Sequence, residues 1–215
     1  MLGNWRTITL TTALSWLMKL ILVGSLLNAI YDGDYLYSIA AFVAIVLSLT
    51  PSIIERNYRV TPPFEVDFLI TLLIFAHIFF GEQMRFYERI WLWDKILHVY
   101  GSAVVCMLAF MIVYTFHNTG KVRLTLPFIG LFTFVFTLAV GGLWEIGEFT
   151  VDYLIGLDTQ RGLNNTMWDM IYDSIGGALI AVLGMIYVRF SHPYERKRLE
   201  KPLGDIFKKK EKPTE

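Results

Sequence analysis

The sequence predicts an all-α protein, a polytopic bundle of about six transmembrane helices. Of its 215 residues, 55% are hydrophobic and only 18% are charged, whereas a soluble domain has about 45–50% apolar and about 25% charged residues. The apolar residues also recur in stretches whose lengths approach the roughly 20 residues that a helix needs to cross the hydrocarbon core. The formal net charge of zero gives no reason to expect a nucleic-acid partner.

Six apolar stretches follow one another along the chain, with polar or charged residues between them. The first is longer than the apolar core of a signal peptide and no A-x-A cleavage site follows it, so we expect a retained span. We further expect residues 1–190 to form one transmembrane domain, followed by a basic cytoplasmic tail over 191–215. The expected spans lie near residues 8–30, 35–54, 64–80, 94–116, 124–149 and 169–190.

The distribution of lysine and arginine predicts the orientation of these spans. Cytoplasmic loops of membrane proteins carry an excess of both residues. With the N-terminus inside, the inner segments and the tail hold most of them, and the outer segments hold only Arg85, Arg89, Lys95 and Arg161. We therefore expect a multi-pass protein of the cell (inner) membrane, with both termini in the cytoplasm and membrane lipids as partners.

Two isolated residues are better explained by packing than by function. Cys106 is the only cysteine, so the sequence excludes an internal disulfide and a cysteine metal cluster. It lies in an apolar run and is expected to be a small buried hydrophobe. His77 lies in the third apolar stretch, where a histidine is more often a hydrogen-bonded core residue than a ligand.

Ionisable side chains gather at one end of the last three spans, which is the outer end in the expected orientation. Within each span they are three or four residues apart and therefore share a helix face. At a rise of about 1.5 Å per residue, His98, Glu145 and Asp173 each lie on the order of 6 Å inside their expected helix ends. Ionisable groups inside membranes are costly and usually functional, so we expect one polar cavity. Its expected members are Asp94, His98, Glu145, Glu148, Asp169 and Asp173.

Several of these residues also have a purely structural explanation. Asp94 could cap the fourth span, Asp169 could belong to a capping box, and Asp152 could be a solvated loop residue. Glu145 and Glu148 have no such structural explanation, because an anion near a helix C-terminus is disfavoured and two carboxylates one turn apart repel. Compensation by a bound cation, by an arginine or by protons is therefore expected.

Residues in the last three spans resemble the signature of VanZ-like membrane proteins, and most closely that of the YjdF-like inner-membrane family. The resemblance implies chemistry on lipid head groups or on the head groups of lipid-linked wall precursors, since VanZ-like proteins are linked to glycopeptide resistance. VanZ-like proteins usually have glutamine and asparagine in place of Glu148 and Asp173, so this site is more acidic. The matching residues are Asp94-Lys95-x-x-His98, Glu145-x-x-Glu148, Arg161, and Asp169-x-x-x-Asp173-x-x-Gly176.

The first functional hypothesis is an enzyme that acts on a lipid or lipid-linked phosphoester at the outer leaflet. All six members of the expected cavity are candidate ligands of a divalent metal, and carboxylate and imidazole groups suit Mg, Mn, Fe or Zn. Without a metal, His98 could act as general base and Glu145 as acid. Arg161 could hold the phosphate. The candidate catalytic residues are His98, Glu145, Asp173 and Arg161.

Two other functions remain open on the sequence alone. Intramembrane acids also build the ion pathways of transporters, and a transporter or ion-coupled binding protein is the second hypothesis. Against it, the acids gather at one end instead of following a path across the bilayer, and no inverted repeat is visible. The third hypothesis is a non-catalytic membrane scaffold.

Overall fold

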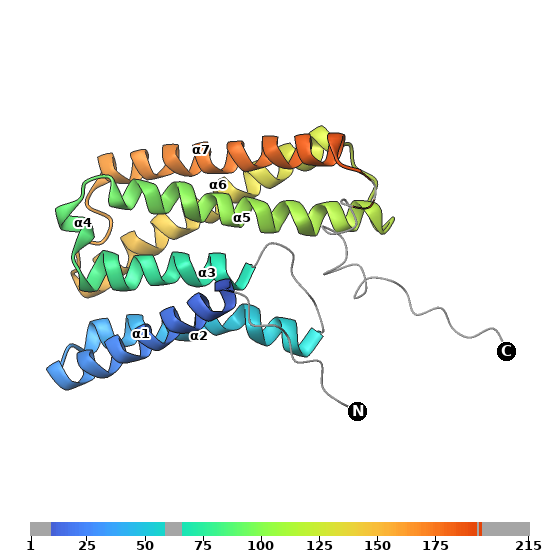
Figure 1. Ribbon diagram of the computed structural model, residues 1–215. Coiled ribbons are helices and arrows are strands. Elements are labelled where there is room, and N and C mark those ends of the chain that lie inside the picture. The colour runs from blue at the N-terminus through green and yellow to red at the C-terminus, as the bar shows by residue number, and fades with distance from the viewer. Residues whose placement is uncertain (1–9, 59–65, 193, 195–215) are drawn as a thin grey trace, which may run out of the picture. The chain divides into compact units, whose positions relative to one another are not determined.

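The computed structural model describes residues 10–58, 66–192 and 194 (Figure 1). In this part of the chain all regular structure is helical, and six helices are long and apolar enough to cross a membrane. The predicted all-α class and number of spans are thereby confirmed. The predicted tail over 191–215 lies almost entirely outside the described residues. The chain divides after Ile90 into two compact units.

The first unit contains three spans and a short helix. They are α1 (Leu10–Asp32), α2 (Tyr35–Tyr58), α3 (Val66–Phe75) with its continuation η1 (Ala76–Gln83), and α4 (Phe86–Arg89). Gly33 separates the first two spans with a φ of 75°, a left-handed conformation that glycine adopts without a steric penalty. Asp34 then begins α2 by accepting a hydrogen bond from the Tyr37 amide at 3.0 Å.

A buried ion pair joins α1 to α3 inside this unit. The Lys19 ammonium, in a residue only 4% exposed, donates to Asp67 Oδ1 at 2.7 Å. The same carboxylate accepts hydrogen bonds from Ser15 at 2.5 Å and from Ser52 at 2.7 Å. A charge within a span is tolerated when it is paired and hydrogen-bonded in this way. The network accounts for the lysine that interrupts the first apolar stretch.

The third span differs from the regular helix that its apolar sequence predicts. Its last eight residues, Ala76–Gln83, form a π-helix, and the span ends three residues later than expected. The Gln83 side chain accepts hydrogen bonds from Ser25 at 2.7 Å and from Tyr37 at 3.3 Å, which ties this end to α1 and α2. His77 is hydrogen-bonded through Nδ1 to the Tyr87 hydroxyl, so its expected role as a satisfied histidine is confirmed.

The second unit consists of three long helices that pack against one another: α5 (Trp93–Asn118), α6 (Leu126–Ile155) and α7 (Leu163–Phe190) (Figure 1). Large apolar side chains such as Leu143, Ile146 and Ile175 remain about half or more exposed on their outer faces. Such faces suit contact with lipid tails.

Two helix boundaries of this unit correct the sequence prediction. The fifth span was expected to end near 149 and the sixth to begin near 169, but α6 continues to Ile155 and α7 already begins at Leu163. The helices continue because no helix breaker occurs before Gly156 or after Gly162, which have φ values of 78° and 86°. The capping-box alternative for Asp169 is therefore wrong, since that residue lies in the second turn of α7.

A glycine allows α5 and α7 to approach closely. A Cβ atom at Gly176 would overlap both the Ser102 hydroxyl and the Val99 carbonyl oxygen of α5. Its neighbour Gly177 similarly faces Thr137 of α6, where a Cβ would lie 3.2 Å from a methyl carbon. Small residues at such crossings let the backbones of membrane helices meet. The three helices are therefore held close at the depth where the polar residues lie.

We expect Lys19→Met to destabilise the first unit by about 1–3 kcal/mol, because it leaves the partly buried Asp67 carboxylate, which is 28% exposed, without its cation. The measurement is thermal or denaturant unfolding of the full chain in detergent. The double variant Lys19→Met/Asp67→Asn should recover more than half of the loss, since it removes both charges. A double variant that is less stable than Lys19→Met would contradict this account of the pair.

We expect Gly176→Ala to lower the stability of the second unit by about 1–3 kcal/mol, because its Cβ would push α5 away from α7. Gly147→Ala is the matched control, since nothing lies within 4 Å of a Cβ at that position of α6. The control should be neutral or stabilising by up to about 1 kcal/mol through helix propensity. Equal melting temperatures for the two variants would rule out a close α5–α7 contact at Gly176.

Candidate functional site

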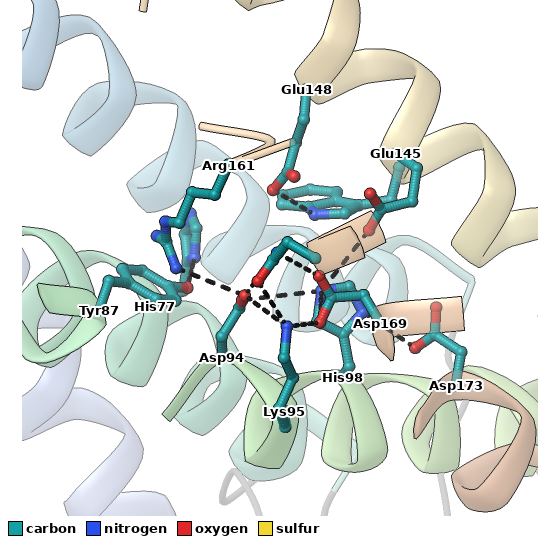
Figure 2. A network of polar contacts seen from close by, with 12 residues as sticks. His77, Tyr87, Asp94, Lys95, His98, Glu145, Glu148, Arg161, Asp169 and Asp173 are labelled. Atoms are coloured by element: carbon teal, nitrogen blue, oxygen red, sulfur yellow. Dashed lines mark hydrogen bonds and ion pairs between the residues drawn. The ribbon is translucent and has the colours of Figure 1, made fainter. Parts of the chain in front are cut away.

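The imidazole of His98 lies at the centre of a polar cluster inside the second unit (Figure 2). Its Nε2 atom faces one carboxylate oxygen from each of three helices. The distances are 3.8 Å to Asp94 Oδ1 of α5, 3.8 Å to Glu145 Oε1 of α6 and 3.7 Å to Asp169 Oδ1 of α7. These separations are too long for hydrogen bonds. The three oxygens therefore surround Nε2 without bonding to it.

The other ring nitrogen of His98 is held by Asp173. Nδ1 lies 3.2 Å from Asp173 Oδ1 on α7. With Asp173 ionised, its oxygen can only accept a hydrogen bond, and the hydrogen of this contact then lies on Nδ1. In the neutral imidazole, the lone pair is then on Nε2 and points toward the three other carboxylates. Asp173 thus fixes both the tautomer and the orientation of the ring.

Lys95 neutralises one side of the cluster. Its ammonium, in a residue only 7% exposed, lies 2.5 Å from Asp169 Oδ1 and 3.2 Å from Asp94 Oδ2. It also donates to Asn165 Oδ1 at 2.8 Å. The Asn165 amide in turn donates to the second oxygen of Asp169 at 2.5 Å and to Asp94 Oδ2 at 3.1 Å. Lysine and asparagine together satisfy much of the hydrogen-bonding capacity of these two carboxylates.

Two buried carboxylates lack such partners. Glu145 is 4% exposed, and neither of its oxygens has a hydrogen-bond partner within the described residues. The same holds for Oδ2 of Asp173, which is also 4% exposed. Buried polar atoms are nearly always hydrogen-bonded, and leaving them unpaired is costly. Figure 2 shows the Glu145 carboxylate directed toward His98, with one of its two oxygens facing the ring.

The absence of a side chain at Gly141 makes room for one of these groups. A Cβ atom at this position of α6 would overlap the unpaired Oδ2 of Asp173. Any larger residue would force the Asp173 side chain away from the His98 ring. Gly141 therefore permits the close approach of α6 to the acidic face of α7.

Glu148 and Arg161 lie at the edge of the cluster. Glu148 accepts a hydrogen bond from Trp144 Nε1 on its own helix at 2.9 Å, and no described contact joins it to His98. Arg161 Nη1 lies 3.4 Å from Asp94 Oδ2, and the arginine side chain is 32% exposed. Its guanidinium therefore lies at a partly exposed edge of the cluster.

The segment that carries Arg161 is organised by Asp152. This carboxylate was considered a solvated loop residue, but it lies in the last turn of α6 and accepts three hydrogen bonds. The donors are the Thr159 amide at 2.8 Å, the Thr159 hydroxyl at 2.6 Å and the Gln160 amide at 2.8 Å. They fold the loop back over the helix end. Arg161 follows with a φ of 54°, which a non-glycine residue adopts only where its surroundings require it.

The arrangement is chemically suited to hold a cation. Asp94, His98 and Asp169 each offer a ligand atom, and these atoms lie within 4.8 Å of one another. The structure thus brings together five of the six residues expected in the cavity, and Glu148 lies apart from the contacts. The sequence interpretation did not assign Lys95 and Asn165 to the site. Their positions carried a signal, because Asn165 lies four residues before Asp169 and Lys95 three residues before His98, spacings that share a helix face.

Comparison with known proteins identifies the family to which this chain belongs. Residues 13–190 match a family model described as a predicted membrane protein of the DUF2238 family. A protein of Thermotoga maritima is 35% identical over 144 residues, which cover 65% of this chain and 71% of the relative, and its function is uncharacterised. No solved structure matches the chain. The chain therefore belongs to the DUF2238 family of membrane proteins, which is the YjdF-like family that its residues resemble.

Proposed function

We propose that this protein is a membrane enzyme that uses a divalent cation in the His98 cluster to act on the phosphoester of a lipid or lipid-linked head group. The observation that carries the proposal is the gathering of three carboxylates, one from each helix, around the free nitrogen of a buried histidine. Purely structural polar residues pair with one another, as Lys19 and Asp67 do. Here several oxygens remain unpaired, and a cation would complete their coordination.

The chemistry follows from the positions of the groups. A bound cation would polarise a phosphoryl oxygen and favour attack on phosphorus by water or a hydroxyl group. The proton of the attacking oxygen would pass to Glu145 Oε2, the carboxylate oxygen that does not face His98 and that has no hydrogen-bond partner in the described residues. It would return to the leaving oxygen as the old phosphorus–oxygen bond breaks. Arg161, 32% exposed at the edge of the cluster, would hold the phosphate.

The depth of the cluster favours a lipid substrate. Glu145 lies ten residues before the end of α6 and Asp173 ten residues after the start of α7, which is about 15 Å along each helix. A site this far below the helix ends would be reached from the bilayer more readily than from water, which favours a lipid over a soluble substrate. The asymmetry of lysine and arginine supports an outer-face position for this end, and the resemblance to VanZ-like proteins, linked to wall precursors, agrees with such a position.

We expect Glu145→Gln to reduce turnover of the lipid substrate at least about 100-fold, because the amide cannot accept the proton. The measurement is mass spectrometry of the lipids and lipid-linked precursors of cells that overproduce each variant. Asp158→Asn, the same chemical change in the exposed loop, is the control and should behave as the wild type. If lipid profiles are unchanged by the wild type while Glu145→Gln abolishes an ion or solute flux, the protein is a transporter and the proposal is wrong.

We expect a cysteine introduced by Asp158→Cys to react with a membrane-impermeant maleimide added outside intact cells. The loop between α6 and α7 is exposed at this residue and lies at the same end as the His98 cluster. The wild type serves as control, because its single cysteine, Cys106, is fully buried and should not react. Labelling only in inverted vesicles would place this loop and the cluster on the cytoplasmic side.

A further inference from the structure

We propose that the cation binds at His98 Nε2 with Asp94, Glu145 and Asp169 as its other ligands, and that the Lys95 ammonium competes with it for Asp169. The inference rests on the cation site proposed above and adds its coordination and its regulation. It assigns a distinct role to each charged group of the cluster. Lys95 would set how tightly the metal binds.

The first step is the spacing of the four ligand atoms. The three carboxylate oxygens lie 3.7–3.8 Å from Nε2. Around one tetrahedral ion with metal–ligand distances of roughly 2.0–2.1 Å, such atoms would lie about 3.4 Å apart. Small side-chain rotations would therefore bring all four atoms onto the ion, and such a shell can expand to five ligands to admit a phosphoryl oxygen. The same separations exceed hydrogen-bond length, and the three contacts are ion pairs only where the ring is protonated.

The second step is the unpaired state of Glu145. It is the only one of the three carboxylates without a hydrogen bond in the part of the chain described, although it is 4% exposed. The oxygens of Asp94 and Asp169 already accept hydrogen bonds from Lys95 and Asn165. A ligand bound at Nε2 would give Glu145 the partner that it lacks.

The third step concerns the metal and its support. One imidazole nitrogen with three carboxylate oxygens suits Zn²⁺, Mn²⁺ or Fe²⁺ better than Mg²⁺, which prefers an all-oxygen octahedron and keeps several waters. Histidine ligands commonly donate their second N–H to a carboxylate. Asp173 takes this position at Nδ1. We therefore assign Asp173 as a positioning residue that orients the ring, and not as a ligand.

The fourth step is the oxygen that two cations would share. Asp169 Oδ1 accepts the 2.5 Å hydrogen bond from Lys95 and is also the oxygen that faces His98 Nε2 at 3.7 Å. A divalent ion at Nε2 would draw electron density from this oxygen and repel the ammonium beside it. Removing the lysine charge should leave Asp94 and Asp169 to the metal alone, because like charges a few ångströms apart repel strongly in a buried site.

The test is titration of the purified full chain in detergent with Zn²⁺, Mn²⁺ and Mg²⁺ after treatment with chelator, followed by calorimetry and thermal shift. We expect Lys95→Met to bind Zn²⁺ at least about 10-fold more tightly than the wild type. Glu145→Gln should bind it at least about 10-fold more weakly, and Asp173→Asn about 10–100-fold more weakly. Zn²⁺ should bind more tightly than Mg²⁺ to every variant that binds metal.

Lys19→Met is the matched control, because it removes the charge of another buried, ion-paired lysine that lies in the first unit. Its metal affinity should equal that of the wild type. If Lys95→Met does not fold, Lys95→Gln removes the charge while keeping an amide donor toward Asn165 and Asp169, and the same increase is expected.

Each outcome tests a different part of the proposal. Affinity that is unchanged or lower in both Lys95 variants would overturn the competition. Absence of metal binding in every protein would overturn the site itself, together with the cation in the proposed function. The expected order of affinities without any change in lipid turnover would leave this inference standing and remove only the enzymatic function.

Discussion

The free-energy cost of burying carboxylates within membrane-spanning helices determines how the polar residues of the second unit are arranged. Asp94, Glu145, Asp169 and Asp173 come from three helices, and each is buried or nearly so. In so apolar a setting, such groups are tolerated only where opposite charge or hydrogen bonds compensate them. Lys95 and Asn165 compensate Asp94 and Asp169 in this way. The close approach of the helices at Gly141 and Gly176 brings Glu145 and Asp173, which have oxygens without such partners, to His98.

The first unit shows how a membrane protein satisfies buried charge when no ligand is involved. Asp67 accepts hydrogen bonds from Lys19, Ser15 and Ser52, so one cation and two hydroxyl groups serve a single carboxylate. The His98 cluster has the opposite balance, because it sets four carboxylates against one buried ammonium and one arginine side chain that is 32% exposed. The contrast lies within one chain. The Asp67 network is balanced and stabilises the fold, whereas the excess of carboxylates around His98 is suited to bind a cation.

Much of this arrangement follows from periodicity in the sequence. Hydropathy alone predicted six spans, and spacings of three and four residues predicted which acids share a helix face. The contacts of Asp94, Glu145, Asp169 and Asp173 with His98 follow from those faces turning toward one another, which spacing alone does not determine. Helix ends were less predictable, because the polar residues near 149 and 169 suggested boundaries where the backbone in fact continues to Gly156 and from Gly162.

Other features had no local signal in the sequence. The π-helical turn at Ala76–Gln83 depends on Gln83 reaching Ser25 and Tyr37 on neighbouring helices, which is a tertiary effect. The role of Asp152 depends on a loop that folds back over the end of α6. Such contacts join residues through space, and no pattern along one helix encodes them.

The extra length of α6 and α7 has a consequence for how a substrate would meet the site. Each helix extends six residues beyond its expected span, or about 9 Å, and the Asp152-bound loop joins them there. A lipid would then enter sideways from the bilayer plane, below this loop. Its availability would be set by its mole fraction among the surrounding lipids and by lateral diffusion, so the reaction would obey surface-dilution kinetics instead of depending on a bulk concentration.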